Sequence, residues 1–342
     1  MTKTPIQWCD FSLNPFRFRN LKTGKVGHHC TKISPGCKNC YASKLNGGPY
    51  LSGLTFIEEN KAKGQFFLDL QALRTLMRRK KPAKVFWCDM TDIFLEDYPD
   101  EWIDQCFAAM ALTPHLTHQV LTKRAERMSS YFASDPWPRI SLEGSKLCGL
   151  SWVNVPLSNV WLGVSVENQQ YADERIPHLL RTPAAVRFVS YEPALGPVDF
   201  RNIQYRDEDL ECCWNVVDGI HQILNSTSVD AIVTSELDGI PKLDWIIIGG
   251  ESGPSARPFN IAWARQTIKQ CRVAGTACFV KQLGAHPYSE KTTHCSDPGA
   301  THDIANGGYY RVEPLSLKDR KGGDMAEWFE DLRVREMPEL IA

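Results

Sequence analysis

Short apolar runs that each end in polar residues recur along this chain, and this rhythm constrains the fold more than any other feature. Six runs show it: KVFWCDMTD, HQVLTKRAER, NVWLGVSVENQ, VRFVSYEP, LDWIIIGGESGP and GTACFVKQLG. Apolar residues at helical spacing follow several of them. Strands that alternate with helices predict an α/β fold with a parallel sheet, either doubly wound or closed into a barrel. In both architectures ligands bind at the carboxyl ends of the strands, so the polar residues are expected to converge there.

The same patterns predict individual elements. One helix is expected from Asp100, as its cap, to a stop at Pro114, and another from the cap Asn260 to Gly275. Residues 56–81 have mostly helical spacing up to Pro82, and a first strand is expected near 25–30. Three further segments are read as an irregular excursion over 130–158, an insertion over about 199–241, and a C-terminal extension over 285–342 that ends in a helix and an extended segment.

A cysteine-rich stretch, HHCTKISPGCKNCYA, precedes these units. It places Cys30, Cys37 and Cys40 in a C-x6-C-x2-C pattern, and a Pro-Gly pair bends the backbone between the first two. Three thiolates facing one centre would bind zinc or an iron-sulfur cluster. A closed site normally takes four protein ligands, so a triad leaves one position open. The alternative is a structural zinc site completed by a fourth ligand, for which the candidates are Cys9, His28 and His29.

Composition narrows the class of protein. The 342 residues are 43% hydrophobic, enough for a sizeable core, yet no run of about eighteen apolar residues exists for a membrane span. The start MTKTPIQWCD lacks the apolar core of a secretory signal, so a cytoplasmic location is expected. Most of the twelve cysteines are scattered singly in apolar settings, which is typical of buried thiols. The net charge of -1 gives no overall drive toward nucleic acid or anionic membrane, and the basic run 78–81 is typical of a solvated helix end.

The cysteine stretch resembles the cluster loop of the radical S-adenosylmethionine (SAM) enzymes, although six residues separate its first two cysteines where the usual loop has three. More closely, the chain resembles the phage-associated Gp37/Gp68 family of DUF5131-type, three-cysteine-motif proteins. The resemblance spans residues 6–338 and is carried by SPGCKNCYA, MTDIF, LTKRAERM, GVSVENQ, RFVSYEP, IIGGESGP, VKQLG and DLRVREMP. It implies a partial TIM-type (β/α)6-7 parallel barrel of radical SAM type over residues 1–284, interrupted by the insertion, with residues 285–342 packed on it.

The resemblance also implies a chemistry. Cys30, Cys37 and Cys40 would hold three irons of a 4Fe-4S cluster, and SAM would chelate the fourth. An electron from the reduced cluster would cleave SAM, and the resulting 5'-deoxyadenosyl radical would abstract hydrogen from substrate. The phage setting of the family favours a nucleotide or nucleic-acid base as substrate, for modification or repair. A protein partner encoded nearby is expected, and no membrane.

Roles for the residues at the strand ends follow from that implied chemistry. Lys123 is expected to pair with the SAM carboxylate, and Ser165, Glu167 and Asn168 with the ribose hydroxyls. Glycines allow close backbone approach, so the GGESG segment is expected to bind the methionyl part of SAM or a substrate phosphate. The remaining predicted cofactor-binding residues are Tyr41, Asp89, Thr91, Asp92, Thr122, Gly249 and Gly250, and the predicted catalytic residues are Glu192, Glu251 and Lys281. The Thr91-Asp92 and Thr122-Lys123 pairs also resemble the spore photoproduct lyase branch of radical SAM enzymes.

Plainer roles stay open for several of these side chains. Lys123 is equally typical of a solvated turn, Glu167 of a helix cap, and Tyr41 of a packing residue. Some of the charged residues at the strand ends are expected to form only structural ion pairs. The main alternative function is a zinc-stabilised α/β protein that binds nucleic acid or a partner without radical chemistry. A zinc hydrolase ranks last because the chain has no H-x-E or HExxH arrangement.

Overall fold

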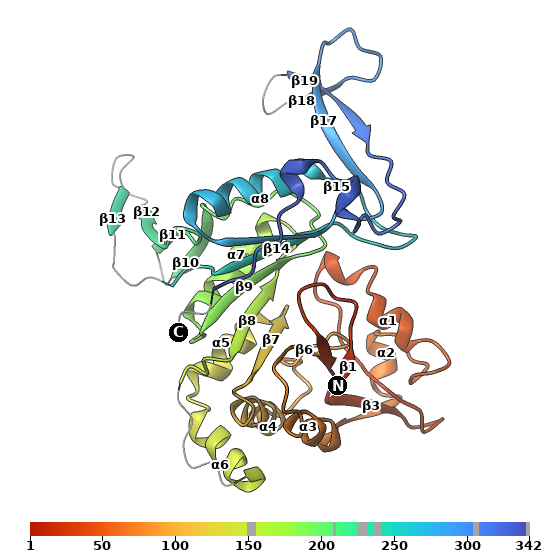
Figure 1. Cartoon of the computed structure of the whole chain (residues 1–342), viewed down its shortest axis with the longest axis vertical. Coiled ribbons are helices and arrows are strands. Elements are labelled where there is room, and N and C mark those ends of the chain that lie inside the picture. Colours follow the sequence, from red (N-terminus) through yellow and green to blue (C-terminus); the bar gives the residue numbers. More distant parts are fainter. Residues whose placement is uncertain (149–154, 208–209, 225–231, 236–240, 304–307, 340–342) are drawn as a thin grey trace. The chain divides into compact units, whose positions relative to one another are not determined.

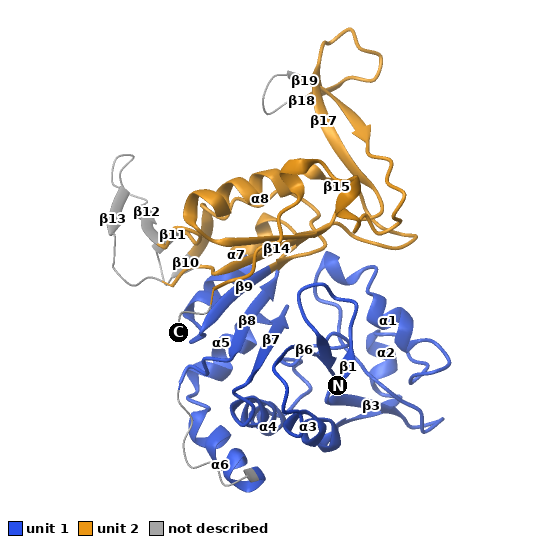
Figure 2. Ribbon diagram, in the orientation of Figure 1, with its two compact units in different colours: residues 1–165, 174–189 blue, residues 166–173, 190–342 orange. Residues whose placement is uncertain are grey.

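The computed structural model describes residues 1–148, 155–207, 210–224, 232–235, 241–303 and 308–339. The chain divides into two compact units, shown in different colours in Figure 2: unit 1 comprises residues 1–165 and 174–189, and unit 2 comprises residues 166–173 and 190–342. Helix α7 (Gln169–Arg181) and strand β9 (Val186–Tyr191) contribute residues to both. The predicted domain boundary at residue 284 stays a prediction.

Unit 1 is built on a largely parallel sheet with the strand order β1-β2-β6-β7-β8-β9 (Figure 1). Strand β1 pairs antiparallel with β2, and the pairs β2–β6, β6–β7 and β7–β8 are parallel. The bounds of β9 are given above, and the remaining strands of this sheet are β1 (Thr2–Lys3), β2 (Phe11–Leu13), β6 (Ala83–Trp87), β7 (Leu116–Thr122) and β8 (Val160–Ser165). Every residue of β8 is buried, as expected of a parallel strand covered on both faces. The predicted α/β class with a large parallel sheet is confirmed.

Helices connect these strands. They are α1 (Tyr41–Asn46), α2 (Glu58–Lys61), α3 (Leu70–Met77), α4 (Asp100–Ala111), α5 (Ala125–Ala133) and α6 (Trp137–Cys148), with a short 3-10 helix, η1, at Pro35–Cys37. Asp100 is the first residue of α4, and its N-cap is Pro99, so the predicted cap was one residue off. Proline is tolerated there because the first N–H groups of a helix have no partner within it.

The irregular excursion expected over 130–158 was wrong for its first half, where α6 forms. Two contacts explain why a segment with Pro138 and Gly144 is helical. Trp137 packs on Phe132 with ring centroids 5.6 Å apart, and Arg139 donates through Nε to the buried Asp104 carboxylate at 2.8 Å. Pro138 lies in the first turn of α6, where its missing N–H costs nothing. Residues 149–154 lie outside the described residues.

The helix expected over 56–81 is interrupted by a strand, and only α2 and α3 of this segment are helical. Residues Gly64–Leu68 form β5, which pairs antiparallel with β3 (Phe16–Asn20), and β3 also pairs with β4 (Val26–Gly27). The strand predicted near 25–30 is therefore limited to the two residues of β4, Val26 and Gly27. Phe66 faces Phe18 across the sheet with ring centroids 4.9 Å apart, so cross-strand packing outweighs helical spacing. The helix begins only at Leu70, where the Asp69 side chain accepts a hydrogen bond from the Ala72 N–H at 3.1 Å.

Unit 2 contains the parallel pair β14 (Trp245–Gly249) and β16 (Ala277–Gln282), joined by α8 (Ile261–Ala274) after the two-residue strand β15 (Phe259–Asn260). Every residue of β14 is buried. The predicted cap Asn260 is confirmed, because its Oδ1 accepts from the Ala262 N–H at 3.0 Å. Gly275 ends α8 in the left-handed conformation with φ 68°.

Two antiparallel sheets complete unit 2. The first, in the order β10-β11-β12-β13, occupies the described part of the expected insertion, and residues 208–209, 225–231 and 236–240 of it lie outside the described residues. The second, in the order β15-β17-β19-β18, occupies the first part of the C-terminal extension. Their strands are β10 (Ile203–Asp207), β11 (Leu210–Asn215), β12 (Ile220–Leu224), β13 (Ile232–Ser235), β17 (Pro287–Thr293), β18 (Thr301–Asp303) and β19 (Gly308–Pro314).

The helix expected near the C-terminus is reduced to two 3-10 turns, η2 (Met325–Glu327) and η3 (Glu330–Leu332). The predicted extended segment does pack back on the body, since Arg335 forms an antiparallel bridge with Phe279. Within the described ranges, no helix has both the length and the apolar character that a membrane crossing requires.

Candidate functional site

The cysteine loop follows β4 and leads into α1. Pro35 occupies the first turn of η1, and Cys37 ends it with its Sγ 3.8 Å from the Ser34 Oγ. Cys40 is the N-cap residue of α1. All three cysteines are half-buried, and Cys30 and Cys40 pack against a small apolar cluster made of Ala42, Phe56 and Met90. The loop therefore has its own packed base within unit 1.

A buried carboxylate is joined to this loop through a neighbouring arginine, Arg124. Asp92, in the segment after β6, is only 5% exposed and accepts four hydrogen bonds. Its Oδ1 accepts from the Thr122 hydroxyl at 2.7 Å and from the Phe94 N–H at 3.0 Å; its Oδ2 accepts from the Lys123 N–H at 3.0 Å and from Arg124 at 3.2 Å. The carboxyl ends of β6 and β7 are thus joined through one side chain.

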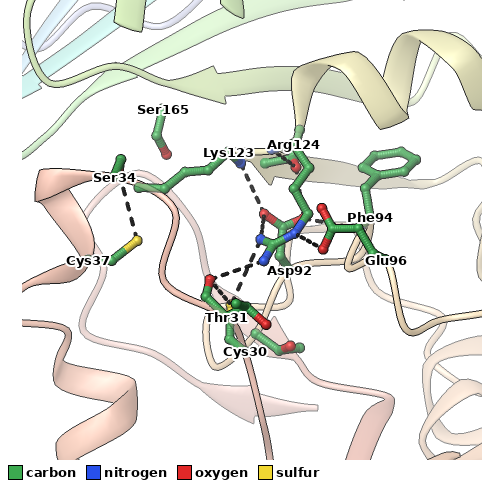
Figure 3. Close-up of polar contacts among 12 residues, drawn as sticks. Cys30, Thr31, Ser34, Cys37, Asp92, Phe94, Glu96, Lys123, Arg124 and Ser165 are labelled. Atoms are coloured by element: carbon green, nitrogen blue, oxygen red, sulfur yellow. Dashed lines mark hydrogen bonds and ion pairs between the residues drawn. The ribbon is translucent and has the colours of Figure 1, made fainter. Parts of the chain in front are cut away.

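Arg124 extends this network to the cysteines. Its guanidinium lies between the carboxylates of Asp92 and Glu96 and reaches down to Cys30 and Thr31 (Figure 3). Nε donates to Glu96 at 2.8 Å, NH2 donates to the Thr31 carbonyl at 3.1 Å, and NH1 lies 3.9 Å from the Cys30 Sγ. Burial acts to lower the pKa of Arg124, but Asp92, Cys30 and Glu96 outweigh it and raise that pKa. A buried, permanently charged guanidinium therefore contacts the first cysteine.

The surroundings of Cys30 change the acidity of its thiol. Burial raises the pKa of the Cys30 thiol to about 12; the Arg124 charge opposes this rise, and Asp92, Cys37 and Cys40 add to it. Cys30 is therefore a neutral thiol at pH 7 in the metal-free chain. A metal that binds it would have to displace this proton, which gives metal loading a dependence on pH.

The donor set fits an iron-sulfur cluster in the kind and number of its ligands, because three cysteines on one loop leave one iron position open. The described His, Cys, Asp and Glu side chains include no group of three already arranged to hold a metal ion. A cluster at this loop is accordingly a proposal, in which Cys30, Cys37 and Cys40 would be the ligands.

The three candidates for a fourth zinc ligand differ sharply. Cys9 lies before the start of β2, at the amino end of the parallel strands, whereas Cys30 contacts Arg124 after the carboxyl end of β7. His28 has both ring nitrogens in contacts, with the Phe16 carbonyl at 3.0 Å and with Arg17 at 3.1 Å. His29 is 1% exposed, and neither of its ring nitrogens has a hydrogen-bond partner among the described residues. Of the three, His29 alone fits as a ligand.

Four other predicted cofactor residues of unit 1 are engaged within the protein. The Tyr41 ring is 53% exposed, and its hydroxyl donates to the Asp89 carbonyl at 2.6 Å. The Asp89 carboxylate accepts from Asn14, and the Thr91 hydroxyl donates to the His29 carbonyl at 2.7 Å. Thr122 is buried, donating to Asp92 and accepting from the Arg124 N–H at 2.8 Å. These residues fix the loops around the cysteines.

The side chains of Lys123 and Ser165 remain the candidates in unit 1 for direct contact with a ligand. Lys123 is half-buried beside the Asp92 network, and its main chain already donates to Asp92. Ser165, the last residue of β8, is buried, and Figure 3 shows it beside Lys123 in the same close-up as the cysteine loop. Their predicted roles toward SAM stay predictions.

The other predicted residues belong to unit 2, where they form two ion pairs. Both Glu192 oxygens accept from Lys281 Nζ at 2.8 Å, so the carboxyl ends of β9 and β16 carry one salt bridge. Glu251 accepts from the Arg257 N–H and Nε at 2.9 Å and from its NH2 at 2.8 Å. The Glu192–Lys281 pair keeps some exposure, 16% and 22% of the two side chains.

The glycines and the ribose candidates of unit 2 have local structural roles. A Cβ on Gly250 would lie 2.4 Å from the Leu283 carbonyl oxygen, so close backbone packing alone accounts for this glycine. Its N–H donates to Gln282 at 2.9 Å. Asn168 caps α7, accepting from the Tyr171 N–H at 3.3 Å, and Glu167 is buried. The helix cap expected of Glu167 is thus supplied by its neighbour.

Sequence reasoning missed Arg124 as a site residue although it lies in the same polar cluster as Lys123. The usable signal was chemical: a buried carboxylate is better matched by the planar, five-donor guanidinium of arginine than by lysine. It also missed Glu96, which pairs with Arg124 from an exposed position. No sequence pattern distinguishes His29, whose unpartnered nitrogens depend on packing against Phe18, Phe56 and Phe66.

Comparison with known proteins identifies the family of this chain, together with two partial matches to other proteins. Two proteins called UvrABC system protein A, from Salmonella typhimurium and Salmonella typhi, are each 24% identical over 168 residues, covering 48% of this chain. The match covers only 16% of the length of these relatives. No solved structure matches the chain. The family model described as "Protein of unknown function (DUF5131)" matches residues 3–317, nearly the whole sequence. The chain therefore belongs to the DUF5131 family, as the sequence motifs predicted.

Proposed function

We propose that this protein is a radical SAM-type enzyme whose reaction acts on a nucleotide or nucleic-acid base. The observation that carries the proposal is the cysteine loop: three half-buried thiols on one loop of unit 1, of which Cys30 contacts Arg124 on the loop that follows β7. In this proposal Cys30, Cys37 and Cys40 hold a 4Fe-4S cluster and leave one iron to SAM.

A cluster of this kind, once reduced, supplies the electron that cleaves SAM and so starts hydrogen abstraction from substrate. The chain's own residues would bind and orient. Lys123 supplies a cation for the SAM carboxylate, and Ser165 offers a hydroxyl to the ribose. Arg124 holds Cys30 in place and balances the negative charge of the ligated thiolates. The catalytic roles predicted for Glu192, Lys281 and Glu251, which belong to unit 2, stay predictions.

The finer fold prediction belongs to the same proposal. A partial (β/α)6-7 barrel is supported by the parallel pairs β2–β6, β6–β7 and β7–β8 with helices between them, and by the position of the polar residues after each strand. A crystal structure of the iron-loaded chain would test it directly.

Anaerobic purification and cluster reconstitution test the function. We expect a brown protein with about four irons per chain, which forms 5'-deoxyadenosine from SAM and dithionite. Cys37→Ala should lose the iron and the product. The matched control is Cys295→Ala, since Cys295 is an exposed free cysteine outside the loop. Equal product from the wild-type chain and Cys37→Ala would refute the proposal.

One observation favours a second candidate, a zinc-stabilised nucleic-acid- or partner-binding protein. His29 precedes Cys30 in the chain, and its two buried ring nitrogens have no hydrogen-bond partner among the described residues, so in this second candidate His29 would be the fourth ligand of a Cys3His zinc site. His29→Gln separates the two functions. In a zinc site the substitution should lower the metal content from about one zinc per chain, whereas in a three-cysteine cluster the iron content should stay unchanged.

A further inference from the structure

The part of the chain that surrounds the cysteines has an unusual charge pattern. Residues Phe11–Ile57 contain no aspartate or glutamate. They carry seven basic residues: Arg17, Arg19, Lys22, Lys25, Lys32, Lys38 and Lys44. Because the net charge of the chain is -1, all other residues together carry -8. Positive charge is therefore concentrated around the proposed metal loop in a molecule that is otherwise acidic.

The five lysines among these basic residues are open to solvent. Lys22, Lys25, Lys32, Lys38 and Lys44 are all exposed, and in the described part of the chain Lys32, Lys38 and Lys44 form no ion pair. Lys32 and Lys38 flank Cys37 along the loop, and Lys44 lies in the last turn of α1. These five lysines, together with two tyrosine rings, are called the basic surface below.

The two rings are those of Tyr41 and Tyr50. Tyr50 is 95% exposed and Tyr41 is 53% exposed, so both residues are open to solvent within a basic stretch of the chain. Tyr41 lies one helical turn before Lys44 on α1, so the two side chains share a face. Tyr50 directly follows Pro49, whose carbonyl accepts from Lys25 Nζ at 2.8 Å. Each tyrosine therefore lies close in the fold to a segment that carries an exposed lysine.

A shared scaffold holds the parts of the basic surface together. Ser52 accepts through its carbonyl from Asn20 at the end of β3, and through its hydroxyl from Asn46 at the end of α1, at 2.8 and 2.7 Å. The turn with Lys22 and Lys25, helix α1 and the segment with Tyr50 are thus fixed to one another within unit 1. This region appears in red to orange in Figure 1.

We infer that the basic surface binds single-stranded nucleic acid, with the lysines on phosphates and the tyrosines stacked on bases. A positive surface carrying exposed aromatic rings is the combination that single strands recognise, because every base offers a face for stacking. The inference names the substrate class of the proposed enzyme and rests on that function for what happens to the bound strand. Binding itself needs no metal.

The test is fluorescence anisotropy of labelled DNA and RNA 12-mers, single- and double-stranded, with the full chain before and after iron loading. The triple variant Lys32→Glu, Lys38→Glu, Lys44→Glu should weaken single-strand binding by about tenfold or more, and should flatten the salt dependence of log Kd by roughly 2. Tyr50→Ala should weaken it by about tenfold. The matched control reverses three charges outside the surface: Arg78→Glu, Lys80→Glu, Lys81→Glu, at the end of α3.

A large loss of single-strand affinity in the Lys32→Glu, Lys38→Glu, Lys44→Glu variant, with little loss of affinity in the control, supports the inference. Equal loss in both, no binding of any oligonucleotide, or binding of phosphatidylserine vesicles in place of nucleic acid would overturn it. The arms with DNA and RNA identify which strand is preferred. Because none of these lysines is a proposed ligand, the variant should keep its iron, so failure of nucleic-acid binding is distinguishable from failure of the metal proposal.

Discussion

Both units place charged residues directly after buried parallel strands, but they use them differently. In unit 1 Asp92 is buried with four donors and its partner Arg124 is buried with it. In unit 2 Glu192 and Lys281 make one salt bridge that keeps contact with solvent. The first arrangement fixes loops, and the second leaves charged groups accessible. A polar residue after a strand therefore marks the carboxyl end of the parallel strands. Whether that residue is buried decides if it fixes the surrounding loops or is accessible to a ligand.

The sharpest test of this contrast removes one carboxylate from each unit. Asp92→Ala leaves the buried Arg124 guanidinium short of a partner and four donors without their acceptor, so unfolding free energy should fall by about 3–5 kcal/mol. Glu192→Ala should cost about 1 kcal/mol, because Lys281 can be hydrated. Urea unfolding of the metal-free variants measures both. Similar losses at the two positions would remove the contrast.

Acid should destabilise unit 1 through a buried histidine. His118 accepts from the Trp87 indole N–H at 3.0 Å, and its other ring nitrogen lies 2.9 Å from the Thr113 hydroxyl, which itself donates to the Ala109 carbonyl. Burial lowers the pKa of His118 to about 3. As the pH falls, this histidine takes up a proton in the unfolded chain first, because its pKa there is near 6.5. The contribution of His118 to the free energy of unfolding is therefore fully present above about pH 6.5 and is lost progressively down to about pH 3.

At pH 5 the loss should be about 2 kcal/mol relative to pH 7.5. It is measured as the difference between the wild-type chain and His118→Gln in urea unfolding at both pH values. His302→Gln, at an exposed position of unit 2, serves as the control and should follow the wild-type chain. An identical pH dependence in His118→Gln would show that this ring does not titrate as its burial requires.

Charge-conserving exchanges refine the comparison. Lysine at position 124 keeps the charge but cannot contact Asp92, Glu96, the Thr31 carbonyl and Cys30 at once, so Arg124→Lys should cost about 2 kcal/mol and lower iron retention. Lys281→Arg should change stability by less than about 0.5 kcal/mol, because its single, partly exposed ion pair with Glu192 tolerates either cation. Iron content after gel filtration is the second readout. Full retention by Arg124→Lys would show that the contact with Cys30 is dispensable.

Helix caps provide the closest match between the two units, with a small effect expected at each. Asp69 caps α3 in unit 1 and Asn260 caps α8 in unit 2, each through one hydrogen bond of 3.1 or 3.0 Å. Alanine at either position should cost about 1 kcal/mol by thermal unfolding. Unequal costs would mean that one helix end depends on its tertiary contacts more than on its cap.

The parallel strands and the α8 cap could be predicted because continuous apolar runs and capping residues act locally. The β3–β5 sheet and α6 could not, since Phe66 and Arg139 are placed by distant partners, Phe18 and Asp104. For the candidate site, residue type and position after a strand predicted Asp92 and Lys123. They did not indicate that Arg124 would reach the cysteine loop, because that contact depends on how two loops pack, 94 positions apart in sequence.

The Arg124–Asp92 network has one consequence for how the protein acquires a metal. Small zinc domains are unfolded until the ion arrives, because the ion supplies their main cross-link. Here hydrogen bonds between protein groups join the loop to the strand ends, because Arg124 donates both to the Thr31 carbonyl and to Asp92. A metal would then bind to a loop that is already folded. A chelator should therefore remove the metal without unfolding the surrounding chain.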